Sequence, residues 1–285
     1  MSQTVFRYRL SVPAKEYENI RARYAKGRVI INKLRKKLSH AILDLGDPNL
    51  CCLVGRKANG PVGQDTLERI QSGSEISKWG VEWDQSIESE DTLQGVLSLV
   101  LENPSIADAT VKMIIQQAAE QAEINLKPID VEHAEIDYVD DCESHTYYID
   151  NLYPKMTQHW DEERIKKDFS LSKLPEDRGN NAKAMGALIK KHLIETARFN
   201  GLDSTQLEQA PLFVQTRIIA TPTPKEKVVI PEDHYSASVA VTFSLPFKLE
   251  GYWFAGGYRH VNSGLITEAT DIQKQKLKTG GTFVL

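Results

Sequence analysis

Several features that would name a class of protein are scarce or absent in this sequence. The chain of 285 residues holds only three cysteines, and two of them, Cys51 and Cys52, are adjacent. An odd number of cysteines with two neighbours makes a poor disulfide framework, and adjacent cysteines lack the spacing of a zinc knuckle. We therefore expect reduced thiols and a reducing, cytoplasmic location.

Long apolar runs are missing as well. No stretch approaches the roughly 20 residues that span a bilayer, and Arg7 and Arg9 stand where a signal peptide would need its apolar segment. We expect neither secretion, nor a membrane span, nor a membrane partner. The sequence also contains no Gly-Lys-Ser/Thr phosphate loop, no His-Glu-x-x-His and no Gly-x-Ser-x-Gly. No motif by itself names a reaction, so we predict no catalytic residue, no metal ligand and no cofactor.

What is present is an ordinary globular composition with an uneven distribution of charge. Hydrophobic residues make up 41% and charged residues 26% of the chain, enough for a buried core. Residues 1–40 contain eleven lysines and arginines against two glutamates, a net charge of +9. Since the whole chain carries -4, the remainder carries -13. Such segregation indicates a charged partner but says nothing of the fold.

Hydrophobic periodicity predicts an α+β fold. Alternation predicts strands, and helical spacing of apolar residues predicts helices. Strands are predicted at 4–12, 79–83, 213–219, 236–247 and 249–254, and helices at 14–45 (with Gly27 as an interruption), 91–102, 105–123 and 181–200. This order predicts a helical middle region and an antiparallel sheet built from the N-terminal strand and the C-terminal strands. We expect a single domain, 1–285, with a helical insertion around 65–205, and we see no internal repeat.

The first candidate site is the basic stretch at 21–37. Its charges recur every two or three residues along the predicted helix, which puts most of them on one broad outer face. They are Arg21, Arg23, Lys26, Arg28, Lys33, Arg35, Lys36 and Lys37. Such a face suits backbone phosphates, and Tyr17 and Tyr24 could add stacking on single-stranded bases. The alternative is a solvated face that pairs with the acidic remainder or with an acidic protein partner.

The second candidate is a glycine-framed segment, Gly251–Gly264, that carries Tyr258, Arg259 and His260. Glycine permits close approach of a ligand to the backbone, while aromatic rings and arginine offer stacking and phosphate contacts. This pattern indicates a nucleic-acid-binding loop. The alternative is a glycine-bent hairpin whose aromatic residues belong to the core.

The third candidate is an acidic run that could hold a divalent metal, as in many nucleases. It comprises Asp130, Glu132, His133, Glu135, Asp137, Asp140, Asp141, Glu143 and His145. On a regular strand, alternation would divide these ligands between the two faces. The run is therefore more typical of a solvated loop, and a metal-dependent hydrolase is only our third choice of function.

One family resemblance ties these observations together. A strand at Thr4–Val12, a following helix, and a late sheet with the glycine-rich segment Gly251–Gly264 resemble the repeat-associated (RAMP, RRM-derived) RNA-binding subunits of CRISPR effector complexes. The matching segments are less than a tenth of the chain, and its acidity and long helical middle depart from the family pattern. The resemblance implies a ferredoxin-like fold, a cytoplasmic role in antiviral defence, and a guide RNA held by shape and backbone.

The function expected from the sequence is therefore a non-catalytic nucleic-acid-binding subunit of a larger assembly. Its partners would be other protein subunits and a nucleic acid, with RNA favoured over DNA. The second choice is a protein–protein assembly or structural subunit without nucleic acid, whose basic N-terminal region docks on an acidic neighbour. Turnover is not expected.

Overall fold

The structure is a computed structural model of the chain. It describes residues 2–18, 20, 23–54, 62–63, 77–84, 91–102, 104, 106–152, 175–220, 238–256, 264–271, 273–274 and 283–284. These residues fall into two compact units, which we call unit 1, within residues 1–135, and unit 2, within residues 136–285. Each unit combines an antiparallel sheet with helices, so the predicted α+β class is confirmed.

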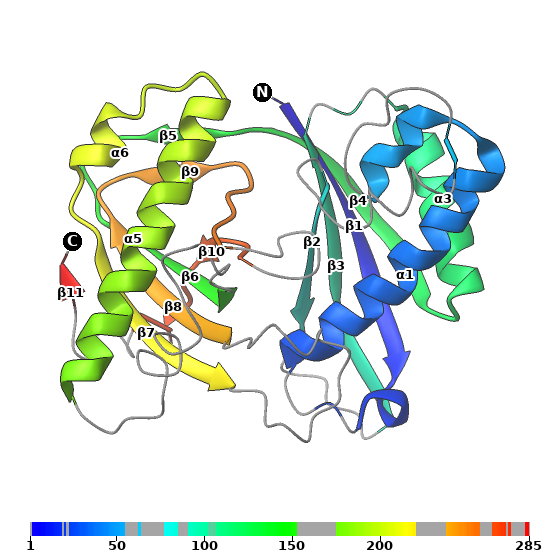
Figure 1. Ribbon diagram of the computed structural model, residues 1–285, viewed down its shortest axis with the longest axis horizontal. Coiled ribbons are helices and arrows are strands. Elements are labelled where there is room, and N and C mark those ends of the chain that lie inside the picture. Colours follow the sequence, from blue (N-terminus) through cyan, green and yellow to red (C-terminus); the bar gives the residue numbers. More distant parts are fainter. Residues whose placement is uncertain are drawn as a thin grey trace. The chain divides into compact units, whose positions relative to one another are not determined.

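Unit 1 has the element order β-α-β-β-α-β. Its elements are β1 (Ser2–Pro13), η1 (Ala14–Tyr17), α1 (Arg23–Leu45), η2 (Pro48–Leu53), β2 (Ser77–Trp83), β3 (Thr92–Glu102), α3 (Asp108–Gln121) and β4 (Asn125–Glu135). The sheet has the order β2-β3-β1-β4, and every neighbouring pair is antiparallel. Figure 1 shows α1 and α3 side by side on one face of it. This arrangement defines a ferredoxin-like unit.

Alternation along β1 explains why this strand occupies the middle of its sheet. One face presents a row of apolar side chains that are at most 2% exposed: Phe6, Tyr8, Leu10 and Val12. Arg7 and Arg9 point to the other face and keep contact with solvent. Because β1 pairs along most of its length with both β3 and β4, its neighbours extend the apolar row across the sheet.

The two helices of unit 1 bury the stripes that the sequence predicts. In α1 the side chains of Ile30, Ile31, Leu34, Leu38 and Ile42 are 0% exposed. In α3 the same holds for Val111, Ile114, Ile115, Ala118 and Ala119. Spacings of three and four residues place each set on one side of its helix, and the two stripes contribute to the core above the sheet.

Unit 2 has its own sheet and core. Its elements are β5 (Asp137–Val139), β6 (His145–Leu152), α5 (Pro175–Phe199), α6 (Thr205–Gln209), β7 (Phe213–Ala220), β8 (Ser238–Leu245), β9 (Lys248–Glu250), β10 (Thr267–Glu268) and β11 (Phe283–Val284). The main sheet has the antiparallel order β10-β6-β8-β7-β11, and β5 pairs separately with β9. Ile149, Ile189, Val241 and Phe243, all 0% exposed, lie in its core.

The two sheets share one strand order. With β1 to β4 numbered along the chain, unit 1 has the order 4-1-3-2; with only β6, β7, β8 and β10 of the main sheet numbered along the chain, unit 2 repeats this order in β10-β6-β8-β7. A long helix joins the first strand to the second in both units, α1 in one and α5 in the other. In unit 2 the described chain between the third and fourth strands contains β9 and no helix, and β11 is added at an edge. The chain is a tandem of two related topologies, although the sequence shows no repeat.

The ferredoxin-like sheet is therefore built from different strands than predicted. β1 pairs with β3 and β4, its near neighbours in the chain, and the C-terminal strands β7 and β8 pair with β6 in the other sheet. The prediction of one sheet from the N-terminal strand and the C-terminal strands is wrong. It failed because the partner β3 was assigned as a helix.

The helix predicted at 91–102 is instead β3, Thr92–Glu102. β3 lies between β1 and β2, and its segment Leu97–Leu101 is almost entirely buried. A strand covered on both faces shows a continuous apolar run instead of alternation, and such a run cannot be told from a buried helix by periodicity.

Other boundaries also shift. The predicted insertion at 65–205 contributes strands β2 to β6 besides helices α3 and α5. The predicted helix at 14–45 is η1 followed by α1, and Gly27 lies within α1 without interrupting it. α5 begins at Pro175, six residues before the predicted start, consistent with the preference of proline for the first helical turn.

Candidate nucleic-acid interface

Four lysines lie on the side of α1 opposite its buried stripe. They are Lys26, Lys33, Lys36 and Lys37, and we call them the lysine face. At 100° per residue they fall within about a third of the helix circumference. Lys36 is exposed, the other three are partly exposed, and exposed His40 extends the row by one turn. From Lys26 to His40 the row is about 21 Å long at 1.5 Å per residue.

Carboxylates do little to neutralise the lysine face. Lys33 Nζ lies 3.9 Å from Glu16 Oε2, and both side chains are more than a third exposed, so this pair contributes little energy. Within the part of the chain that the structure describes, Lys26, Lys36 and Lys37 form no ion pair. Among the described residues, Glu16 is thus the one carboxylate that pairs with the lysine face.

The equivalent helix of unit 2 is different in this respect. On α5, Lys191 Nζ lies 3.7 Å from Glu195 Oε1, one turn further along. Arg198 donates a hydrogen bond of 2.8 Å to Glu208 in α6. Lys191 and Arg198 of α5 thus each have a carboxylate partner within unit 2, whereas on the lysine face of α1 only Lys33 has one among the described residues.

Arg35 does not belong to the lysine face, although the sequence grouped it there. Its side chain is buried, 6% exposed as a residue, and its guanidinium donates a hydrogen bond to the carbonyl oxygen of Val54. Burial lowers the pKa of Arg35 to about 10. Helix geometry explains the difference, because position 35 lies beside the buried positions 31, 38 and 42. Arg28, seven residues earlier, lies on the same flank and is half-buried.

Part of the N-terminal positive charge is compensated inside unit 1. Arg7 donates hydrogen bonds to Asp130 Oδ2 at 3.1 Å and to Glu132 Oε2 at 2.5 Å, both on the neighbouring strand β4. The first half of the acidic run therefore has a structural partner. The net charge of +9 of residues 1–40 is therefore larger than the positive charge that α1 presents to a ligand.

Several predicted contacts fall outside this face or outside the described residues. Tyr17 is 3% exposed, so its ring is not available for stacking, and burial raises the pKa of its hydroxyl. Arg21 lies outside the described residues, as do Tyr258, Arg259 and His260. The side chains of Arg23 and Tyr24 are likewise not described.

The base of the glycine-framed segment is well defined. Phe254 and Leu265 form an antiparallel bridge, and the Ala255 N–H donates to the Gly264 carbonyl at 2.8 Å. Trp253 and Phe254 are buried in unit 2, as expected if the aromatic residues belong to the core. Gly264 has a φ of +79°, and a Cβ there would lie 1.7 Å from the Ala255 oxygen. The described ends of the segment, at Ala255 and Gly264, are thus held close together.

The structure divides the acidic run between the two units. On β4, His133 lies between Thr4 Oγ1 at 3.2 Å and Asp108 Oδ2 at 3.3 Å, an arrangement that the sequence did not reveal. In unit 2, Asp141, Glu143 and His145 come together at the turn before β6. These three residues are the group from the run whose ligand atoms converge among the described residues. Sequence alternation alone did not single them out.

Comparison with known proteins finds structural resemblance and no sequence family. No protein-family description matches the chain, and no curated protein matches it. A solved structure described as Csf5, a CRISPR-Cas type IV Cas6 crRNA endonuclease, is 15% identical with a TM-score of 0.49, covering 95% of this chain and all of that one. A RAMP protein binding different RNA substrates is 9% identical with a TM-score of 0.39, covering 95% of this chain and all of that one.

A third structure, the CRISPR RNA processing endoribonuclease Cas6b, is also 9% identical, with a TM-score of 0.39 and 93% of this chain covered. The RAMP resemblance stated from the sequence is thus confirmed as a structural resemblance. At TM-scores below 0.5 this structural resemblance supports no conclusion about function. Among the described helices, none is long and apolar enough to cross a bilayer.

Proposed function

We propose that this chain is an RNA-binding subunit that holds a nucleic-acid backbone on the lysine face of α1. The observation that carries the proposal is the row of Lys26, Lys33, Lys36 and Lys37, of which only Lys33 approaches a carboxylate among the described residues. Lysine ammonium groups are point charges that neutralise phosphates and release condensed counterions. A row about 21 Å long can contact several successive phosphates.

Recognition on this face is of the backbone and not of base sequence. The described side chains of the face are lysines and His40, with no Tyr, Phe or Trp ring for stacking, since Tyr17 is buried. Phosphate contacts fix register and orientation but carry no sequence information. The face therefore suits a partner held by shape and charge.

RNA is the proposed ligand by analogy of fold. Unit 1 has the ferredoxin-like topology to which RNA-binding RRM folds belong. We propose for this chain a binding role without turnover, within a larger assembly.

The proposal is tested by removing charge from the lysine face and from a matched surface. In the face variant, Lys33, Lys36 and Lys37 are replaced together by Ala. In the control variant, three exposed lysines of unit 2 are replaced by Ala: Lys191, Lys248 and Lys274. The control variant then has the same net charge as the face variant. Fluorescence anisotropy with labelled single-stranded RNA at low salt should show weaker binding to the face variant, by a similar factor for unrelated sequences, and unchanged binding to the control.

Two results would contradict this function. One is equal binding of RNA by the face variant and the control variant, which would place the interface elsewhere. The other is no binding of any oligonucleotide by the wild-type chain at low salt, which would favour an acidic protein as the partner of α1. Denaturing gels of the same RNA after incubation test the proposed lack of turnover, and specific cleavage products would contradict it.

A further inference from the structure

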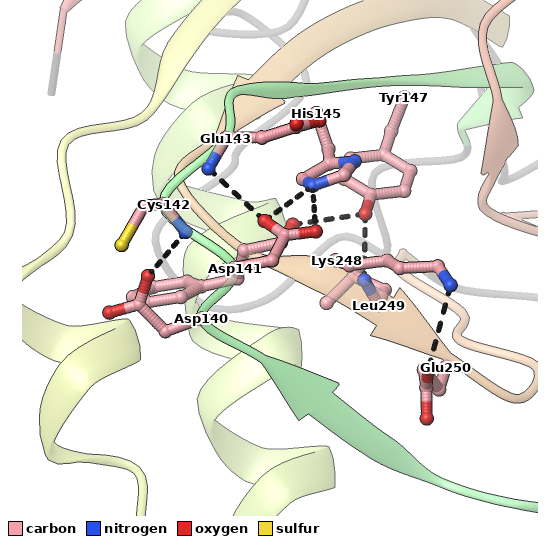
Figure 2. A network of polar contacts seen from close by, with 10 residues as sticks. Asp140, Asp141, Cys142, Glu143, His145, Tyr147, Lys248, Leu249 and Glu250 are labelled. Carbon is pink, nitrogen blue, oxygen red and sulfur yellow. Dashed lines mark hydrogen bonds and ion pairs between the residues drawn. The ribbon is translucent and has the colours of Figure 1, made fainter.

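Three side chains with metal-ligating atoms converge at the turn between β5 and β6. Asp141, Glu143 and His145 each offer one ligand atom, and these atoms all lie within 4.8 Å of one another. They occupy alternate positions in the chain, and Figure 2 shows the Asp141 carboxylate facing the imidazole of His145. The group is separate from the lysine face, since it belongs to unit 2.

The histidine in this group is held on a structured support. His145 Nε2 lies 2.9 Å from both carboxylate oxygens of Asp141, and its ring centroid lies 6.5 Å from that of Tyr147. The Tyr147 hydroxyl donates to the Phe247 carbonyl at 3.0 Å and accepts from the Leu249 N–H at 2.7 Å. His145 begins β6 and pairs in register with Leu245 of β8. The Nε2 atom of His145 is therefore held by a residue at the start of a paired strand.

The side chains that precede His145 in this turn are mostly acidic. Asp140, Asp141 and Glu143 lie in one turn, and none of them forms an ion pair with a lysine or arginine among the described residues. Figure 2 shows the nearby lysine, Lys248, paired instead with Glu250, at 3.6 Å.

We propose that Asp141, Glu143 and His145 bind a divalent transition-metal ion of the Zn²⁺ type. One imidazole nitrogen with two carboxylates is a mixed donor set that suits Zn²⁺, whereas Ca²⁺ and Mg²⁺ favour oxygen ligands alone. Each carboxylate is partly or fully exposed, and His145 Nε2 already faces Asp141, so the ligands need only small rotations to enclose an ion. Three protein ligands leave a coordination position for water or for an oxygen of a phosphate.

The test is metal binding by the full-length chain, first freed of metal by a chelator. Isothermal titration with Zn²⁺, and visible absorption with Co²⁺ as its spectroscopic substitute, measure affinity and coordination. Removing one ligand in His145→Asn should weaken the binding of one ion per chain by about tenfold or more, because even indirect partners of a metal ligand contribute that much. Glu143→Gln, a second variant at an exposed side chain, should weaken it as well.

His133→Asn provides the matched control. His133 is also a histidine paired with an aspartate, at 3.3 Å from Asp108, but it is not part of a three-ligand group among the described residues. Its replacement should leave Zn²⁺ affinity unchanged. Two outcomes would overturn the proposal: equal affinity in wild type, His145→Asn and Glu143→Gln, or no Zn²⁺ binding by the wild type. RNA binding on α1 is measured separately and does not depend on either result.

Discussion

The guanidinium of Arg35 donates a hydrogen bond to the carbonyl oxygen of Val54, while the next residue, Lys36, is exposed on the outer side of α1. Adjacent basic residues on one helix thus have different tasks. Arg35 joins α1 to the end of η2 inside unit 1, and Lys36 remains free to meet a ligand. Charge counting along the sequence does not separate these roles, but helix geometry does.

Replacing Arg35 by Ala should destabilise unit 1 without weakening RNA binding. The change leaves the Val54 carbonyl without its donor and removes buried side-chain volume, which together should cost about 1–3 kcal/mol. Urea unfolding measures the stability, and anisotropy on the folded protein measures the binding. Lys36→Ala should show the opposite pattern, with stability within about 0.5 kcal/mol of wild type and reduced affinity. A loss of affinity in Arg35→Ala as large as in Lys36→Ala would contradict the assignment.

The buried stripe of α3 gives a test of the core. Ile115 is 0% exposed, so Ile115→Ala should lower the free energy of unfolding by about 2–5 kcal/mol, through lost burial and a cavity. Met113 lies on the same helix but is 52% exposed, and Met113→Ala should change stability by only about 0.5 kcal/mol. Thermal unfolding followed by circular dichroism compares the two. Similar melting temperatures for both variants would show that the helix face is misplaced.

Gly264 should tolerate no side chain. In Gly264→Ala the Cβ would lie 1.7 Å from the Ala255 oxygen in a residue with a φ of +79°, so the base of the glycine-framed segment must open. Gly46 has a φ of +65° but nothing within 4 Å of a Cβ, so Gly46→Ala isolates the backbone strain of about 1–2 kcal/mol. Amide hydrogen exchange at Ala255 and Ile266 should rise in Gly264→Ala alone. Retained protection there would contradict the described geometry.

Asp141 should titrate below an ordinary aspartate in the metal-free protein. The hydrogen bond from His145 is the main cause that lowers the pKa of this carboxyl. A depressed pKa means that the pair stabilises the fold above the ordinary aspartate pKa and that this contribution is lost as the pH falls through the lowered value. His145→Asn should therefore raise the Asp141 pKa, as read from carboxyl carbon shifts by nuclear magnetic resonance. An unchanged titration in that variant would show that His145 is not the partner.

The sequence predicts best those elements whose periodicity is clear. The strand with Phe6, Tyr8 and Leu10 and the helix with Ile114 and Ile115 lie where alternation and helical spacing put them. β3 was missed because a strand buried on both faces has no period of two. The pairing of strands was missed with it, since a wrong element leaves β1 without its true neighbour.

The candidate site was predictable in part for a similar reason. Periodicity places Lys33, Lys36 and Lys37 on the outer side of the helix. It would also have placed Arg35 on the buried side, had the buried stripe been used to sort the basic residues. The approach of Asp141 to His145 depends on the local turn, where Cys142 has a φ of +63°. Such a backbone conformation is rare outside glycine and is not read from residue types.

The salt dependence of RNA affinity tests the central claim most directly. Each phosphate contact on a single strand should contribute a slope of about -0.7 to the logarithm of affinity against the logarithm of salt concentration. If Lys33, Lys36 and Lys37 all contact phosphates, their joint replacement by Ala should flatten the slope by about 2. Replacement of Lys191, Lys248 and Lys274 should leave the slope at the wild-type value. Equal slopes for the wild type and the lysine-face variant would contradict a phosphate-binding role for α1.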